Sequence, residues 1–322
     1  MNQSYDRLAQ HLDSNAPLCT ALSSYRIIEV SGVDSEKFLQ GQLSCDMRKL
    51  AEVGHIPGSH CNIKGHMISL FRLFYLDPQK IWLRVHESIA QSALDNLKKY
   101  SIFSKVTLRF ADELSGVAVD ATNSRKLCVG FEINPDHKPL YVKDDGVVAV
   151  YDEALYEIWA EDNILLTCLE AGKLKGTPES HWNLANIERG LVDLRAETQE
   201  HFIPQMTNLQ AVEGVSFNKG CYTGQEIVTR LQHRGILKKA MYRFSAAVVE
   251  DVEPGSELVN SDGASVGEVV LAASTESETH LLAVVQQAQI DAGETLKLAS
   301  GTELSFSGLP YELDPMLFEK KR

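Results

Sequence analysis

The chain has 322 residues, 44% of them hydrophobic and 23% charged, which is typical of a soluble globular protein with two or three domains. Its formal net charge of −13 argues against broad electrostatic binding of nucleic acid, which needs a clustered basic surface. Scattered cysteines without a CxxC pair, a polar N-terminus and no bilayer-length apolar run exclude a disulfide framework and a membrane span, and favour the cytosol.

The first part of the chain shows the patterns of an α+β unit. The predicted elements are a strand at 25–31, a short helix capped by Asp34, an antiparallel meander over 61–86, an amphipathic helix over 87–100 and a strand at 106–110. Turn signals at 64–65 and 77–80 separate the strands of the meander. We therefore expect an N-terminal α+β lobe over residues 1–112.

A second α+β lobe is expected over residues 113–235. Its strand candidates are 116–120, 126–131, 147–151 and 156–160, and its helix candidates are 163–172 and 180–189. Residues 199–226 are less regular, and a long loop inside a compact domain is usually functional. The sequence leaves open whether the two lobes are contiguous or interleaved.

The pattern changes after Gly235, where short apolar runs alternate with turn signals up to the end of the chain. This alternation predicts a small β-barrel or sandwich over residues 236–322. The fold class is therefore α+β, with two antiparallel-sheet lobes followed by a C-terminal small β-barrel. No glycine-rich phosphate loop and no GxSxG nucleophile pattern occurs in the sequence.

The most informative stretch is Lys219-Gly220-Cys221-Tyr222-Thr223-Gly224-Gln225-Glu226. An ammonium group close to a thiol raises its thiolate fraction, so Lys219 is a candidate activator of Cys221. Gly220 and Gly224 allow turns that other residues resist. The alternative is a tight turn carrying a small buried cysteine, because free cysteine is among the most buried residue types.

Two further groups of residues have candidate roles. Trp182 and Glu188 share the predicted helix at 180–189, about 120° apart around its axis. The indole could stack on a flat heterocycle and the carboxylate could accept ring N–H groups; the alternative is a core tryptophan and a solvated glutamate. The second group is His55, His60, Cys61 and His66, whose spacing fits no standard zinc arrangement, so we predict no metal site.

The run 218–226 resembles the signature of the YgfZ family of folate-binding, tRNA-modification-related proteins, and residues 31–42, 60–65 and 202–210 agree with it. The resemblance implies the fold of the glycine cleavage T-protein, an aminomethyltransferase, with two α+β lobes around a central folate pocket and a C-terminal β-barrel. It also implies a role, using tetrahydrofolate or another reduced folate, in maintaining iron–sulfur enzymes, including those that methylthiolate tRNA.

By position, the resemblance places folate contacts at Tyr25, Trp182 and Glu188, although relatives have tryptophan where Tyr25 stands. The aminomethyltransferases carry an acidic pair after the hairpin glycines, whereas residues 66–70 contain no carboxylate here, which argues against aminomethyl transfer. The leading hypothesis is a cytosolic folate-binding protein with Cys221 as a reactive thiol, acting on tRNA indirectly.

Two alternatives remain open. The first is a folate-dependent one-carbon transferase on an unidentified substrate, and the second is a non-catalytic adaptor that docks through residues 219–226. The expected partners are folate and iron–sulfur enzymes; we expect no membrane partner and no direct contact with nucleic acid.

Overall fold

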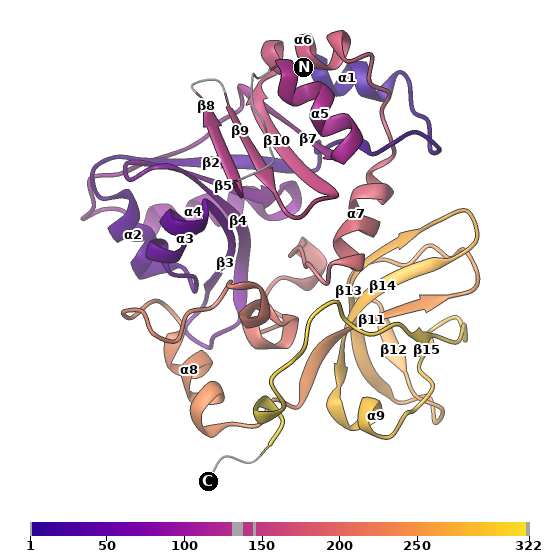
Figure 1. Cartoon of the computed structure of the whole chain (residues 1–322). Coiled ribbons are helices and arrows are strands. Elements are labelled where there is room, and N and C mark those ends of the chain that lie inside the picture. Colours follow the sequence, from indigo (N-terminus) through magenta and orange to yellow (C-terminus); the bar gives the residue numbers. More distant parts are fainter. Residues whose placement is uncertain (1, 131–137, 144–145, 320–322) are drawn as a thin grey trace. The chain divides into compact units, whose positions relative to one another are not determined.

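The structure is a computed structural model that describes residues 2–130, 138–143 and 146–319, and these residues form antiparallel sheets with helices packed on them (Figure 1). The chain divides into two compact units. The first unit comprises Met1–Gln40, Asp46–Ile56 and Phe71–Trp182, and the second comprises Gly41–Cys45, Pro57–Leu70 and Asn183–Arg322. The α+β class with antiparallel pairing is thereby confirmed.

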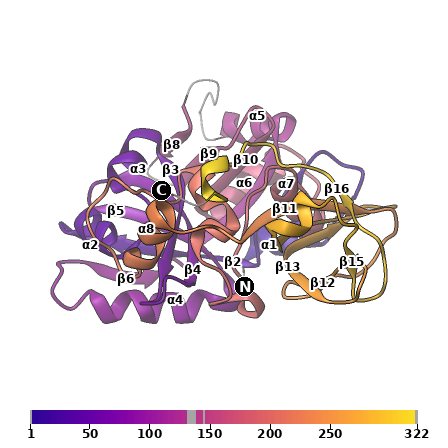
Figure 2. The ribbon, with the colours of Figure 1, turned by 90° about the horizontal axis from the view of Figure 1, so that it is seen from below.

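One sheet has the strand order β3-β4-β5-β2-β6. Its strands are β2 (Tyr25–Ser31), β3 (His55–Cys61), β4 (Met67–Asp77), β5 (Lys80–His86) and β6 (Thr107–Phe110), and α2 (Ser35–Gln42) and α3 (Met47–Val53) connect β2 to β3. Helix α4 (Glu87–Tyr100) packs across β2, β5 and β6 (Figure 2). The buried residues of the helix are apolar. The predicted meander and the predicted helix at 87–100 are confirmed. In the helix, the buried residues from Ile89 to Leu97 have the helical spacing on which the prediction rested.

The second sheet lies in the first unit and has the order β1-β7-β10-β9-β8. Its strands are β1 (Cys19–Ala21), β7 (Leu114–Asp120), β8 (Leu140–Lys143), β9 (Gly146–Val150) and β10 (Leu155–Glu161), and its helices are α1 (Gln3–Ala9), α5 (Ala121–Gly130) and α6 (Asp162–Ala171). Because β1 pairs with β7, residues near the N-terminus complete a sheet whose other strands follow residue 113. The domain boundaries at residues 112 and 235 stay predictions.

The strand predicted at 126–131 is wrong. Residues up to Gly130 belong to helix α5, and Phe131 lies outside the described residues. Asp120 accepts the backbone N–H of Asn123 at 2.8 Å at the start of this helix, and Leu127 is buried in the core of the second sheet. A short apolar run does not distinguish a strand from a buried helix by periodicity alone, and tertiary packing decides between them.

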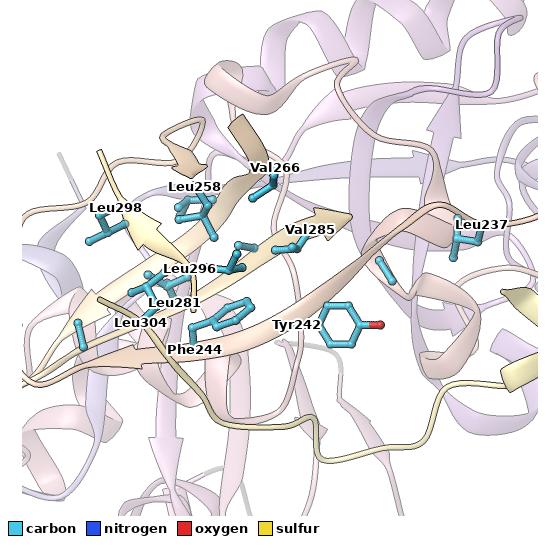
Figure 3. Packing of buried hydrophobic residues seen from close by; sticks show 14 of the residues in the cluster. Leu237, Tyr242, Phe244, Leu258, Val266, Leu281, Val285, Leu296, Leu298 and Leu304 are labelled. Carbon is cyan, nitrogen blue, oxygen red and sulfur yellow. The ribbon is translucent and has the colours of Figure 1, made fainter. Parts of the chain in front are cut away.

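The C-terminal part of the second unit is a single sheet with the order β15-β12-β13-β14-β11-β16, curled into a half-barrel (Figure 1). Its strands are β11 (Lys239–Ala246), β12 (Glu257–Val259), β13 (Ser265–Ser274), β14 (Thr279–Gln286), β15 (Lys297–Leu298) and β16 (Ser305–Phe306), with α9 (Gln287–Asp291) after β14. Phe244, Leu281 and Val285 lie in its core (Figure 3). The strands after Gly235 thus form a single curled β-sheet, as predicted for this part of the chain.

Helix α7 (Glu179–Glu188) precedes three short 3-10 helices, η1 (Ala196–Thr198), η2 (Pro204–Thr207) and η3 (Leu209–Val212). Of these, η2 and η3 lie in the irregular region predicted at 199–226. Helix α8 (Gln225–Arg234) then follows the cysteine motif, and η4 (Pro315–Leu317) lies near the C-terminus. Among the described residues, none of the helices has the length and apolar character needed to cross a membrane.

Candidate functional site

Lys219 anchors the loop of residues 219–224 that contains Cys221, here called the cysteine loop. Its side chain is only 8% exposed, and its Nζ donates hydrogen bonds to the carbonyl oxygens of Leu43 at 2.6 Å and Cys45 at 2.7 Å. The ammonium also lies 5.0 Å from the centre of the Tyr222 ring, within the range of a cation–π contact. These contacts satisfy the buried ammonium group and give Lys219 a structural role. The activation of Cys221 by Lys219 stays a prediction.

The segment 43–45 that receives Lys219 is itself fixed by hydrogen bonds. Ser44 Oγ donates to the carbonyl of Gly214 at 2.6 Å and lies 2.9 Å from Ser59 Oγ, and its backbone carbonyl accepts the Ser216 N–H at 2.9 Å. Buried polar groups satisfied in this way hold a single geometry. Lys219 is therefore bound to a segment whose own position in the second unit is fixed by buried hydrogen bonds.

Gly224 lets the motif approach the hairpin between β3 and β4. Its φ of +81° is in the left-handed region, and a Cβ there would lie 2.4 Å from the carbonyl oxygen of Asn62 and 2.9 Å from Cys61 Cβ. Only glycine fits such a position without a shift of the backbone. By contrast, a Cβ on Gly220 would meet nothing within 4 Å, and nothing in the structure explains that glycine.

Cys221 is exposed, so the alternative of a small buried cysteine is wrong. The other cysteines whose side chains the structure describes are buried, namely Cys19, Cys45, Cys61 and Cys168. Burial raises the pKa of the Cys19 and Cys61 thiols to about 12, which keeps them protonated at neutral pH. Within the described residues, Cys221 is thus the thiol that a reagent in solution can reach.

A groove of about 830 Å³ runs along the exposed face of α8, with Cys221 in its lining. It is lined by Cys221, Tyr222, Gln225, Glu226, Thr229, Arg230, His233 and Arg234. Helix α8 was not among the predicted elements, although Ile227, Val228 and Leu231 have helical spacing directly after Gly224. The helix places its basic side chains along the groove that contains the thiol.

The structure brings the two predicted aromatic contacts together. Trp182 Nε1 donates a hydrogen bond to Tyr25 Oη at 3.0 Å, and the two rings meet edge to face with centroids 6.5 Å apart. The Arg84 guanidinium lies 4.5 Å from the centre of the Tyr25 ring and 5.4 Å from that of Trp182. Sequence reasoning did not identify Arg84, because its strand reads as ordinary core.

Arg84 forms a buried ion pair with Glu157, at 3.3 Å between Nε and Oε1. The carboxylate of Glu157 also accepts the Trp159 indole N–H at 2.6 Å and the Tyr151 hydroxyl. Arg84 lies on β5 and Glu157 on β10, so the pair joins two sheets, and both of these strands belong to the first unit. A buried charge pair of this kind requires such additional hydrogen bonds to offset its desolvation.

These residues fit a reduced folate only in part. Tyr25 is 4% exposed and Trp182 is fully buried, so neither ring offers an open face for stacking. Glu188, at the end of α7, is exposed, and its carboxylate is therefore accessible to the N–H groups of a ligand. The folate-binding roles of all three residues stay predictions.

A carboxylate from another part of the chain lies beside the β3–β4 hairpin, although residues 66–70 contain none. Glu200 has a φ of +64°, and its carboxylate accepts a hydrogen bond from Asn62 Nδ2 at 2.8 Å. Its backbone N–H donates to the carbonyl of Met67 at 2.9 Å. The residue is distant in sequence from the hairpin, so local spacing gave no signal for it.

The histidines near the hairpin do not form a metal centre in the described part of the chain, where no group of three or more His, Cys, Asp or Glu side chains is arranged to hold an ion. Burial and the neighbouring Arg72 guanidinium lower the pKa of His55 to about 3, so its ring stays neutral. His60 and Cys61 are buried on β3.

No protein-family model matches the chain. A protein of Klebsiella pneumoniae named tRNA-modifying protein YgfZ is 31% identical over 312 residues, covering 91% of this chain and 92% of the relative. A protein of Colwellia psychrerythraea with the same name is 36% identical over 225 residues, 69% of each chain. An uncharacterized protein of Haemophilus influenzae is 34% identical over 299 residues, 91% of this chain and 98% of its own.

In structure, the chain resembles the glycine cleavage system aminomethyltransferase T from Bartonella henselae. The TM-score is 0.72 with 16% sequence identity, and the match covers 98% of this chain and 90% of the other. The predicted aminomethyltransferase-like fold is therefore confirmed. At this level of identity the likeness concerns the fold, and the chemistry has to be argued from the residues themselves.

Proposed function

This chain belongs to the YgfZ family of tRNA-modifying proteins, and we propose that it acts in the cytosol by binding reduced folate and maintaining iron–sulfur enzymes, among them those that methylthiolate tRNA. Its thiol Cys221 is the reactive group. Contact with tRNA is indirect, because the chain carries a net charge of −13.

The observation that carries this proposal is the construction of the cysteine loop. Buried hydrogen bonds from Lys219 and the close approach of Gly224 to the β3–β4 hairpin fix the loop on both sides of Cys221, while Cys221 itself stays exposed. A loop held rigidly around an exposed thiol is the arrangement that reactive cysteines use, since reactivity requires access as well as position.

For the folate, Glu188 is the contact that the geometry supports best, because its carboxylate is exposed and accepts N–H donors. Tyr25 and Trp182, which are buried in the first unit, are proposed as folate contacts on the resemblance to the family alone. When bound, a reduced folate supplies a carrier for one-carbon units. The residues of the chain would bind and orient it.

Calorimetric titration with tetrahydrofolate under reducing, anaerobic conditions tests this site. We expect the wild-type chain to bind and Glu188→Gln to bind about tenfold or more weakly, since a hydrogen bond to a charged group contributes about 1.5–3 kcal/mol. Glu170→Gln, which changes an exposed carboxylate on α6, is the matched control and should bind normally. Absence of binding at high micromolar ligand would contradict the folate assignment.

Complementation of a strain lacking its own copy tests the thiol. We expect wild-type chain and the buried-site control Cys168→Ala to restore methylthiolated tRNA nucleosides, measured by mass spectrometry, and Cys221→Ser to fail. The serine hydroxyl is a far weaker nucleophile than a thiolate at neutral pH. Full restoration by Cys221→Ser would refute the reactive-thiol role and favour an adaptor that docks through residues 219–226.

A further inference from the structure

The groove along α8 combines the exposed thiol with cationic side chains. Arg230, His233 and Arg234 line it and are exposed, and Arg230 and Arg234 stand one turn apart on the helix. Glu226 is the acidic residue among the lining residues. None of the ion pairs recorded within the described residues involves these two arginines, so the groove presents positive charge on a chain whose net charge is −13.

Two of the residues that line the groove have hydroxyl groups without a recorded hydrogen-bond partner. Tyr222 lines it and is 6% exposed, and its hydroxyl has no hydrogen-bond partner among the described residues. The Thr229 hydroxyl, in the same lining, is likewise buried without a partner. Buried polar groups in native proteins are normally satisfied, so these two unpartnered hydroxyls beside the groove are candidate hydrogen-bonding groups for a ligand or for water.

From these observations we propose that the groove binds small anionic disulfides and that Cys221 exchanges with them. The proposal rests on the reactive thiol of the proposed function and names its substrate class. The Cys221 thiolate attacks one sulfur of the disulfide, the S–S bond breaks, and the other half leaves as a thiolate that takes up a proton. Cys221 ends in a mixed disulfide. Its sulfur is formally oxidised, and the departing half of the disulfide is reduced to a thiol by the same two electrons.

The sign of the charge effect makes the proposal testable. The net charge of −13 alone would attract cations and repel anions, whereas Arg230 and Arg234 in the groove act in the opposite sense. In water, an interaction between two unit charges about 7 Å apart changes the rate of reaction of a charged disulfide by roughly threefold. Salt screens this interaction, with a Debye length of about 8–10 Å. A preference of Cys221 for anions would thus report the groove and not the whole chain.

The experiment compares two disulfides of similar size and opposite charge, 3,3′-dithiodipropionate and cystamine, reacting with the full chain. Intact-mass spectrometry follows the half-disulfide adduct, with Cys221→Ser as the blank. Dividing each rate by that of a free neutral thiol with the same disulfide removes the intrinsic reactivities. We expect a normalised anion-to-cation ratio of about ten or more at low ionic strength, approaching one in high salt.

Matched variants locate the effect. Arg230→Gln/Arg234→Gln should lower the ratio at least about threefold, Glu226→Gln should raise it, and Lys98→Gln, an exposed lysine on α4, should leave it unchanged. A ratio near one at low salt, or one that the double variant does not move, would refute the anion-selective groove while Cys221 still reacts. Failure of Cys221 to react with either disulfide would refute the reactive thiol as well.

Discussion

Glu157→Leu is expected to lower the free energy of unfolding of the first unit by about 3–5 kcal/mol, the usual cost of removing one partner of a buried ion pair. Glu157 is fully buried, and its carboxylate faces the Arg84 guanidinium at 3.3 Å while accepting the Trp159 N–H at 2.6 Å. The substitution removes one acceptor from several buried donors at once. Because the pair joins two sheets, the loss affects the packing between them as well.

Replacing both partners tests the physical reason. Arg84→Met/Glu157→Leu puts apolar side chains on both strands and should be more stable than Glu157→Leu alone, because the Arg84 guanidinium is then no longer buried opposite a missing carboxylate. Urea unfolding followed by tryptophan fluorescence measures this, since the three tryptophans, Trp82, Trp159 and Trp182, all lie in the first unit. A cost like that of a surface pair, about 1 kcal/mol or less, would contradict the prediction.

Local sequence patterns predicted the elements that local periodicity specifies. Helix α4 begins and ends where the apolar spacing from Ile89 to Leu97 indicates, and the β3–β4 turn forms at Gly65, whose φ is +79°. The same reasoning failed at α5, because the apolar run around Leu127 is too short to distinguish a helix from a strand.

The contacts of the candidate site could not be read from local spacing. Lys219 binds the carbonyl of Cys45, 174 positions away, and Trp182 binds Tyr25, 157 positions away. The sequence identified Lys219, Cys221, Tyr25 and Trp182 as residues of interest, but their burial and partners depend on how distant segments meet. Arg84, Glu157 and Glu200 gave no local signal, since the ion pair between Arg84 and Glu157 and the hydrogen bond from Asn62 to Glu200 join residues that are far apart in sequence.

Lys219→Met is expected to lower the free energy of unfolding of the second unit by about 2–4 kcal/mol. The ammonium donates to two buried carbonyl groups, and hydrogen bonds to charged groups contribute about 1.5–3 kcal/mol each, part of which the methionine side chain recovers by packing. Far-UV circular dichroism in urea measures the change, because the second unit contains no tryptophan. Lys238→Met, at an exposed position, is the matched control and should cost less than about 0.5 kcal/mol.

The same variant separates two roles of Lys219. If Lys219 only anchors the loop, Lys219→Met loses stability, and the alkylation rate of Cys221 in the folded protein stays within about twofold of wild type. If its charge activates the thiol, the rate falls in proportion to the lost thiolate fraction even where the protein is fully folded. Because Lys219 Nζ is already held by the carbonyls of Leu43 and Cys45, we expect the first result. A large fall in the rate with unchanged stability would assign Lys219 to the chemistry of Cys221 and refute the anchoring role.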